Sequence, residues 1–183
     1  MSYDIAINKS WEAFLALAGA KDRGIHFLAD EYAIDTVNRR IFSVSCNVPA
    51  KDYTAILILH YAAAALKGLP PLENTWFTFR ELSGVEGYQE AFRQRVIERI
   101  LKKYGNNPEG LLCVLERVKG SRAPQADVSV IIEAFEKIPV MIEIWKGDEE
   151  LGPEANLLFD KSITSVFCTE DIVVLAERIA AFV

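Results

Sequence analysis

The sequence contains few of the residues that most often build metal and redox sites. It has three cysteines and two histidines among 183 residues. Cys46, Cys113 and Cys168 never fall in the CxxC spacing of zinc or iron–sulfur ligands, so we expect no metal centre built from them. Their odd number is typical of free thiols in a reducing compartment, and we expect most of them to be buried. Their role stays open.

Long apolar runs and secretory leaders are also missing. The best candidate for a membrane span, Ala55 to Leu66, is interrupted by His60 and Tyr61 and is too short to cross a bilayer. The first residues show no basic segment followed by an apolar one and a small-residue cleavage site. We therefore predict a soluble cytoplasmic protein that makes no membrane contact.

The signatures of common catalytic and nucleotide-binding sites are absent from the sequence. There is no GxSxG, no GxGxxG and no GxxxxGK[ST], so neither a serine nucleophile nor a phosphate-binding loop is recognisable. The 20 basic and 26 acidic residues give a net charge of −6, which argues against a nucleic-acid partner. Basic residues gather within 88–104, but Glu90 and Glu98 lie among them, which favours a solvated helix face.

The chain is long enough and apolar enough to bury a core of its own. A length of 183 residues predicts a single domain, residues 1–183, and 51 % of the residues are hydrophobic. This hydrophobic fraction is above the usual range. We therefore expect part of the apolar surface to contact a partner or a pocket, and a homodimer is one way to cover it.

The hydrophobic patterns predict an α+β fold with a mainly antiparallel sheet. Residues 24–45 are rich in β-branched and aromatic residues and predict a meander of two or three strands. VSVIIEAF and PVMIEIW predict two further strands, which the short connection at 136–138 makes antiparallel. Helices are expected over 53–66, 88–104 and 170–182, packed on the sheet.

The helices differ in how clearly the sequence marks them. Tyr88, Phe92, Val96 and Ile100 form an apolar stripe at helical spacing. The helix over 53–66 is apolar nearly all round, which predicts a position inside the fold. We expect an earlier short helix to begin after Ser10, and Thr169 to cap the last helix.

The best polar candidate follows an aromatic strand. WFTFREL, residues 76–82, predicts a strand that places Thr78 and Arg80 on one face. Arg80 could then bind a carboxylate such as Asp148 or Asp160 through its forked guanidinium. A structural ion pair is the preferred interpretation, and a ligand-binding site is the alternative.

Three further positions are candidates for chemistry. His60 lies in the apolar helix, where a hydrogen-bonded structural histidine is the preferred interpretation and a switch or general base the alternative. Trp145 precedes the acidic turn 148–150 and could form the wall of a ligand site, although packing is the commoner role for tryptophan. The acids of this turn and Asp160 are of the right type for magnesium or calcium, but no EF-hand spacing is present, so we predict no metal site.

Three motifs in order carry a resemblance to a known family. They are the strand ending in WKGDEE, the step LFD at 158–160 and the helix start TED at 169–171. Over about residues 8–182 the chain resembles the uncharacterised bacterial and archaeal family called domain of unknown function 3786. The resemblance implies a cytoplasmic protein of anaerobes without an established activity. Some relatives resemble fusions to a cysteine-rich iron–sulfur segment similar to that of corrinoid iron–sulfur proteins. This chain lacks that segment, so the resemblance transfers no residue here and the cofactor stays unknown.

Two functional hypotheses follow. The leading one is a non-catalytic binding or accessory module for a protein or small-molecule partner, because no catalytic constellation accompanies the apolar surplus. The alternative is an enzyme that uses carboxylates, with or without a divalent metal. The candidate ligand-binding residues are Arg80, Asp148, Asp160, His60 and Trp145.

Overall fold

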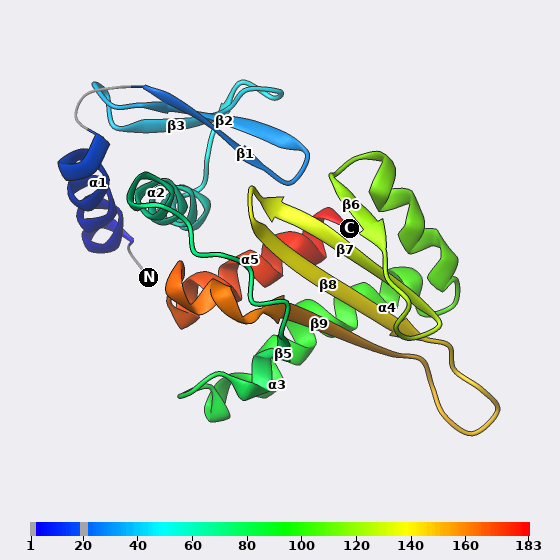
Figure 1. Ribbon diagram of the computed structural model, residues 1–183. Helices are drawn as coiled ribbons and strands as arrows, with labels where there is room; N and C mark the ends of the chain where they lie inside the picture. Colours follow the sequence, from blue (N-terminus) through cyan, green and yellow to red (C-terminus); the bar gives the residue numbers. More distant parts are fainter. Residues whose placement is uncertain (1–2, 19–21) are drawn as a thin grey trace.

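The N-terminal part of the chain forms two helices and a small sheet. The computed structural model describes residues 3–18 and 22–183. Helix α1 (Asp4–Ala18) packs on α2 (Asp52–Lys67), and the meander between them lies above the pair (Figure 1). Its strands pair in sequence order and antiparallel: β1 (Arg23–Phe27), β2 (Asp30–Asp35), β3 (Arg40–Ser43) and β4 (Val48–Pro49). This confirms the predicted meander and adds a short fourth strand.

The second sheet is the centre of the fold. Its five strands pair antiparallel in the order β5-β9-β8-β7-β6. They are β5 (Trp76–Thr78), β6 (Gly120–Arg122), β7 (Val128–Phe135), β8 (Ile138–Trp145) and β9 (Glu154–Asp160). Alternate residues of β8, namely Val140, Ile142 and Ile144, are fully buried, as one core-facing side of a strand should be.

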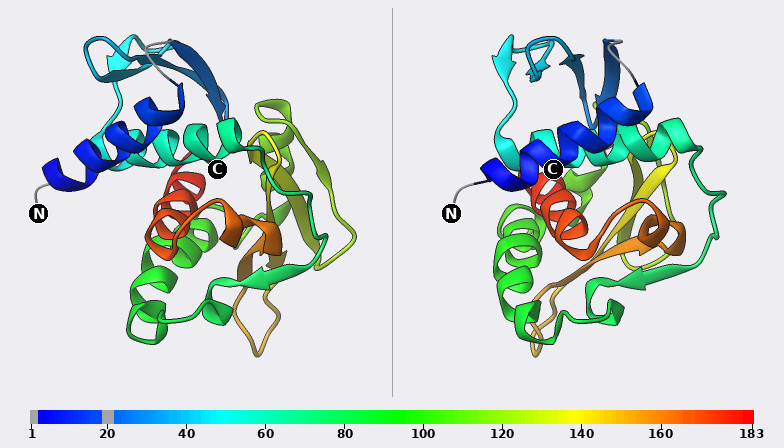
Figure 2. Two further views of the ribbon diagram at one scale, coloured as in Figure 1. Left: turned by 60° about the vertical axis from the view of Figure 1, so that its left-hand side comes forward. Right: turned by 90° about the vertical axis from the view of Figure 1, so that its left-hand side faces the viewer.

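Helices cover one face of this sheet (Figure 2). A continuous helix runs through α3 (Gln89–Phe92), a π-helical turn (Arg93–Ile97) and α4 (Glu98–Tyr104), and α5 (Thr169–Phe182) lies beside it. Short 3-10 helices span Phe79–Glu81, Glu86–Tyr88, Pro108–Glu116 and Lys161–Ser165. The predicted stripe is buried in the core, since Val96 and Ile100 are 0 % exposed. The fold is a single α+β domain, as predicted.

An aromatic stack joins the two sheets. Phe135, at the end of β7, stacks on Phe27 of β1 at 4.4 Å and on Tyr61 of α2 at 4.3 Å. Beside this stack the backbone N–H of Leu28 donates to the carbonyl oxygen of Ala134 at 2.7 Å. The apolar helix α2 therefore lies inside the fold, as its composition predicts, and both sheets share one core.

Two predicted helix starts are wrong. Ser10 lies inside α1, where its hydroxyl donates to the carbonyl oxygen of Ala6 at 2.9 Å, so it does not cap the helix. The cap of α5 is Cys168 rather than Thr169, because the thiol and the backbone N–H of Cys168 both point to Asp171 Oδ2, at 3.2 and 3.4 Å. The predicted strand 76–82 ends early, at Thr78.

The prediction that the cysteines are mostly buried is also wrong. Cys46, Cys113 and Cys168 are all exposed and free. Cys46 lies between β3 and β4, Cys113 in a surface 3-10 helix and Cys168 at a helix start, so none lies on a core-facing side of a strand or helix. In the described part of the chain, no helix is both long and apolar enough to cross a membrane.

Candidate functional site

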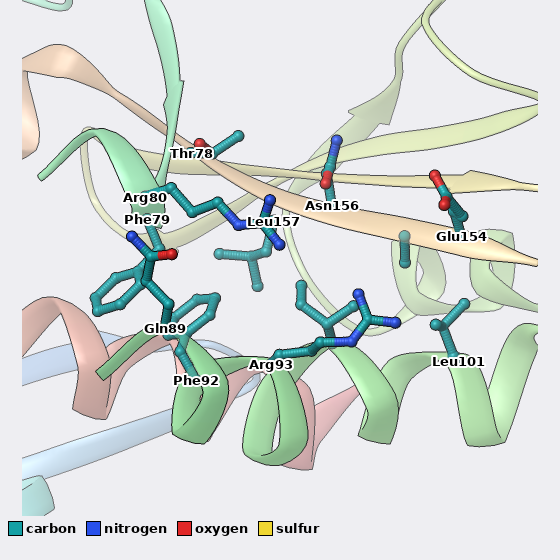
Figure 3. Close-up of a pocket in the computed structure, with 12 residues that line it drawn as sticks. Thr78, Phe79, Arg80, Gln89, Phe92, Arg93, Leu101, Glu154, Asn156 and Leu157 are labelled. Atoms are coloured by element: carbon teal, nitrogen blue, oxygen red, sulfur yellow. The ribbon is translucent and has the colours of Figure 1, made fainter. Parts of the chain in front are cut away.

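A cleft lies between β9 and the helix of residues 89–104 (Figure 3). Its volume of about 340 Å³ is within the range of ligand-binding pockets. Four consecutive residues of β9, 154–157, form one wall, the turn at 78–80 closes one end, and the helix forms the opposite wall. The lining residues are Thr78, Phe79, Arg80, Gln89, Phe92, Arg93, Ile97, Leu101, Glu154, Ala155, Asn156 and Leu157.

The cleft exists because β5 stops before it reaches this part of β9. The backbone N–H and the hydroxyl of Thr78 both donate to Glu81 Oε2, at 2.7 and 2.9 Å. This capping box turns the chain into the 3-10 helix of residues 79–81 and away from the sheet. The last strand pair is Thr78 with Leu158, so β5 leaves residues 154–157 uncovered.

The uncovered part of β9 presents backbone groups to the cleft. The N–H of Lys161, next after β9, donates to the carbonyl oxygen of Thr75 at 2.8 Å, so Lys161 directs its backbone groups toward the β5 side. Backbone groups of alternate residues point to the same edge of a strand, so Leu157 and Ala155 direct theirs to this side as well. Within residues 3–18 and 22–183, no strand pairs with them there.

Aromatic packing fixes the distance between the turn and the helix. The rings of Phe79 and Phe92 stack at 4.0 Å with an interplanar angle of 1°, and Tyr88 meets Phe79 edge-on. Such a pair stabilises by about 0.5–1.5 kcal/mol beyond its buried area. Phe79 and Phe92 are 2 % and 6 % exposed, so the stack also gives the cleft an apolar floor.

Two arginines supply the charge of the cleft. Figure 3 shows the side chains of Arg80 and Arg93 reaching from the turn and from the helix into the space beside β9. Arg80 forms no ion pair with any residue in the described part of the chain. Arg93 Nε lies 3.7 Å from Glu98 Oε1, and both side chains are more than half exposed, so this pair is weak. Glu154 stands at the far end, so the cleft has a positive and a negative end.

The helical wall contains a π-turn at the cleft. Residues 93–97 have π-helical hydrogen bonding, and both Arg93 and Ile97 line the cleft. A π-turn inserts an extra residue into an α-helix and is found frequently at functional sites. It rotates the helix surface, so Arg93 and Ile97 face the cleft while the neighbouring Val96 stays in the core.

Asp160, a predicted site residue, is bound to the backbone instead of facing the cleft. It is 1 % exposed and accepts hydrogen bonds from the N–H groups of Glu73, Asn74 and Ser162 at 3.1, 2.7 and 3.0 Å. Burial alone would raise the pKa of the Asp160 carboxyl, but the hydrogen bonds from Ser162, Glu73 and Asn74 hold it below its ordinary value. Asp160 thus anchors the segment that leads into β5.

The structure does not bring Asp148 or Trp145 to Arg80. Asp148 accepts hydrogen bonds from the N–H groups of Leu151 and Glu150, which lower its pKa, and it lines a separate hollow in the β8–β9 connection. Trp145 is half-buried at the end of β8, opposite Glu154. Among the residues described, no group of three or more His, Cys, Asp or Glu could hold a metal ion.

His60 joins three helices through both of its ring nitrogens. Nδ1 lies 2.8 Å from Asp171 Oδ2 of α5, and Nε2 lies 2.8 Å from Ser10 Oγ of α1. Ser, His and Asp in this order are the partners of a serine hydrolase triad. Here Ser10 is 3 % exposed and its hydroxyl bonds Ala6, so it presents no nucleophile to a substrate. The arrangement holds α1, α2 and α5 together.

Sequence reasoning singled out Arg80, with Thr78 on the same face, but missed most of the other cleft residues. Gln89, Arg93 and Asn156 lie on elements whose mutual packing no local pattern reveals. One local signal was available, since Thr78 and Glu81 form the [ST]xx[DE] pattern of a capping box. That pattern marks the end of β5 and therefore the place where β9 becomes uncovered.

By its fold, this chain is a two-sheet α+β domain with an uncovered strand edge. Comparison of its sequence with known protein families identifies the family. The sequence profile of the family described as Domain of unknown function (DUF3786) matches residues 14–181. The chain belongs to this family. No curated protein and no solved structure matched the chain.

Proposed function

We propose that the protein is a non-catalytic binding module whose cleft takes an extended, acidic polypeptide segment of a partner protein. The observation that carries the proposal is the uncovered edge of β9, which runs along the cleft. A strand that enters there continues the line of β5 and can bond to the backbone of Ala155 and Leu157. Strand addition of this kind gives affinity through the main chain and specificity through side chains on alternate positions.

The charges of the cleft support an acidic ligand. Arg80 is exposed and lacks a carboxylate partner in the described structure, and Arg93 has only a weak one. Guanidinium groups bind carboxylates through paired hydrogen bonds. Long charged side chains over a sheet edge also discourage unwanted strand pairing. A strand with an acidic residue opposite the arginines neutralises this protection, whereas a neutral or basic strand does not.

The remaining lining sets further requirements for the ligand. The floor of Phe79, Phe92 and Leu157 accepts an apolar side chain, and Gln89 and Asn156 offer amide groups at the rim. Glu154 disfavours a second acid at the far end. We also infer that the module works in the cytoplasm, since its three exposed thiols are free, as in a reducing compartment.

Peptide selection tests the proposal. A random heptapeptide library is selected against the immobilised full chain and, in parallel, against the Arg80→Gln/Arg93→Gln variant. We expect the wild-type chain to enrich peptides with an acidic residue flanked by β-branched or aromatic ones. Their affinity for the double variant should fall at least tenfold, because the arginine contacts are lost. Arg39→Gln/Arg40→Gln, at the start of β3, also removes two positive charges from exposed positions outside the cleft and should bind like wild type.

Two outcomes count against the proposal. One is an absence of peptides that bind the wild-type chain more tightly than the double variant. The other is a concentration-dependent dimer, seen by size-exclusion chromatography with light scattering, that the double variant abolishes. In the second case a second copy of the chain, rather than a partner peptide, occupies the cleft.

A further inference from the structure

A second cluster of arginines lies on the other side of the helix of residues 89–104. Arg95 and Arg99 of this helix and Arg178 of α5 line one hollow of about 350 Å³. The two helices lie side by side here (Figure 2), and Tyr53, at the start of α2, completes the rim. None of these residues lines the β9 cleft.

The positive charge of this hollow is poorly compensated. Arg95 Nη1 contacts Glu177 Oε1 at 3.2 Å and the hydroxyl of Tyr88 at 2.8 Å. Among the described residues, Glu177 is the only carboxylate that lines the hollow. Arg99 and Arg178 have no ion-pair partner within the described ranges 3–18 and 22–183. Two guanidinium charges are therefore left over in a chain whose net charge is −6.

Arg178 carries an unsatisfied donor in addition to its charge. Its Nε atom is buried and has no hydrogen-bond partner among the described residues. Because Nε is buried, the Nη groups are the donors that Arg178 can offer to a ligand, and paired guanidinium N–H groups fit two oxygens of one anion.

We propose that this hollow is a binding site for a phosphate group, as inorganic phosphate or as a phosphate monoester. Phosphate offers more acceptor oxygens than a carboxylate and carries up to two charges, which matches two uncompensated guanidinium groups. The bound group would connect α5 to the helix of residues 89–104 through the guanidinium groups of Arg178 and Arg99, which line the hollow. This site is independent of the peptide cleft, because the two share no residue.

Titration with inorganic phosphate tests the site. Amide spectra of the ¹⁵N-labelled full chain are recorded at constant ionic strength, with sodium chloride as the reference salt. We expect saturable shifts around Arg99 and Arg178, and at least tenfold weaker binding in Arg178→Gln and in Arg99→Gln. Lys102→Gln removes one charge from an exposed position on the same helix and should leave binding unchanged. Phenyl phosphate, titrated in the same way, shows whether a monoester fits.

The outcomes separate the two sites. Arg80→Gln should weaken peptide binding and leave the phosphate titration unchanged, while Arg99→Gln should do the reverse. If Arg178→Gln does not fold, Arg99→Gln decides alone, because Arg99 is an exposed residue of the same hollow. The proposal fails if phosphate gives the same response as chloride, or if both arginine variants bind phosphate like wild type.

Discussion

Asp160 should be among the residues on which stability depends most. It is a buried carboxylate that accepts three backbone hydrogen bonds, two from the segment before β5 and one from the 3-10 helix after β9. In Asp160→Ala these three N–H groups lose their acceptor. Each unsatisfied buried group costs about 1–3 kcal/mol, and Glu73 and Asn74 are exposed enough to regain water. We therefore expect a loss of about 3–5 kcal/mol.

Urea unfolding at pH 7, followed by tryptophan fluorescence, measures this loss. For a domain of 183 residues each kcal/mol corresponds to about 2–4 °C in the melting temperature, so a shift of roughly 6–20 °C is expected. Asp160→Asn keeps one oxygen acceptor and should lose about half as much. Glu73→Gln changes an exposed side chain in the same segment and serves as the control, with a change within about 0.5 kcal/mol.

The effect of Asp160 should also depend on pH. Its pKa is lower in the folded protein than in the unfolded chain, so the carboxylate stabilises the fold above the unfolded pKa of about 3.9. This stabilisation is lost as the pH falls below that value. The difference between wild type and Asp160→Asn should thus be constant from pH 6 to 8 and shrink below pH 4. The reasoning would be refuted if Asp160→Ala lost less than 1 kcal/mol of stability at pH 7. It would also be refuted if the difference in stability between wild type and Asp160→Asn did not change with pH.

Two further predictions concern the start of α5. Asp171→Ala removes the acceptor for His60 and Cys168 and should cost about 2–4 kcal/mol in urea unfolding, whereas Glu170→Ala, an exposed neighbour, should change stability by less than about 0.5 kcal/mol. An equal loss in both variants would contradict a specific role for Asp171. Although the residue as a whole is exposed, desolvation of its sulfur at the start of α5, together with the Asp171 carboxylate, raises the pKa of Cys168 to about 11. At pH 8 about one thiol in a thousand is then ionised. In a Cys46→Ser/Cys113→Ser variant, iodoacetamide should therefore modify Cys168 roughly 100-fold more slowly than a free thiol of ordinary pKa. A rate comparable to that of the free thiol would contradict the raised pKa of Cys168.

The sequence predicts the parts of the fold that depend on local patterns. The stripe through Phe92, Val96 and Ile100 marks its helix because burial of one face is a repeating, local requirement. The hairpin of β7 and β8 follows from two apolar runs and a short turn. The π-turn at 93–97 escapes such reasoning, because the extra residue serves the contact with β9 and not the helix itself.

The candidate site depends on long-range packing and is harder to predict. Arg80 stands out as a charged residue after an aromatic strand, but its position relative to Asp148 and Asp160 depends on where β5 ends and how β9 pairs with it. The sequence predicts a helix that begins after Ser10, and only the packing of α1 on α2 brings Ser10 to His60. In both cases the decisive neighbour is distant in sequence.

Hydrogen exchange at β9 tests the central claim, that the uncovered edge of β9 binds a peptide strand, most directly. Amide exchange of the full chain is measured by NMR with and without a peptide selected on the wild-type protein. Strand addition predicts that exchange at Ala155 and Leu157 slows markedly on binding. The backbone groups of Asn156 point to β8, so amide exchange at Asn156 should change little. A peptide that binds tightly but leaves Ala155 and Leu157 unprotected would show that the edge of β9 is not the binding site.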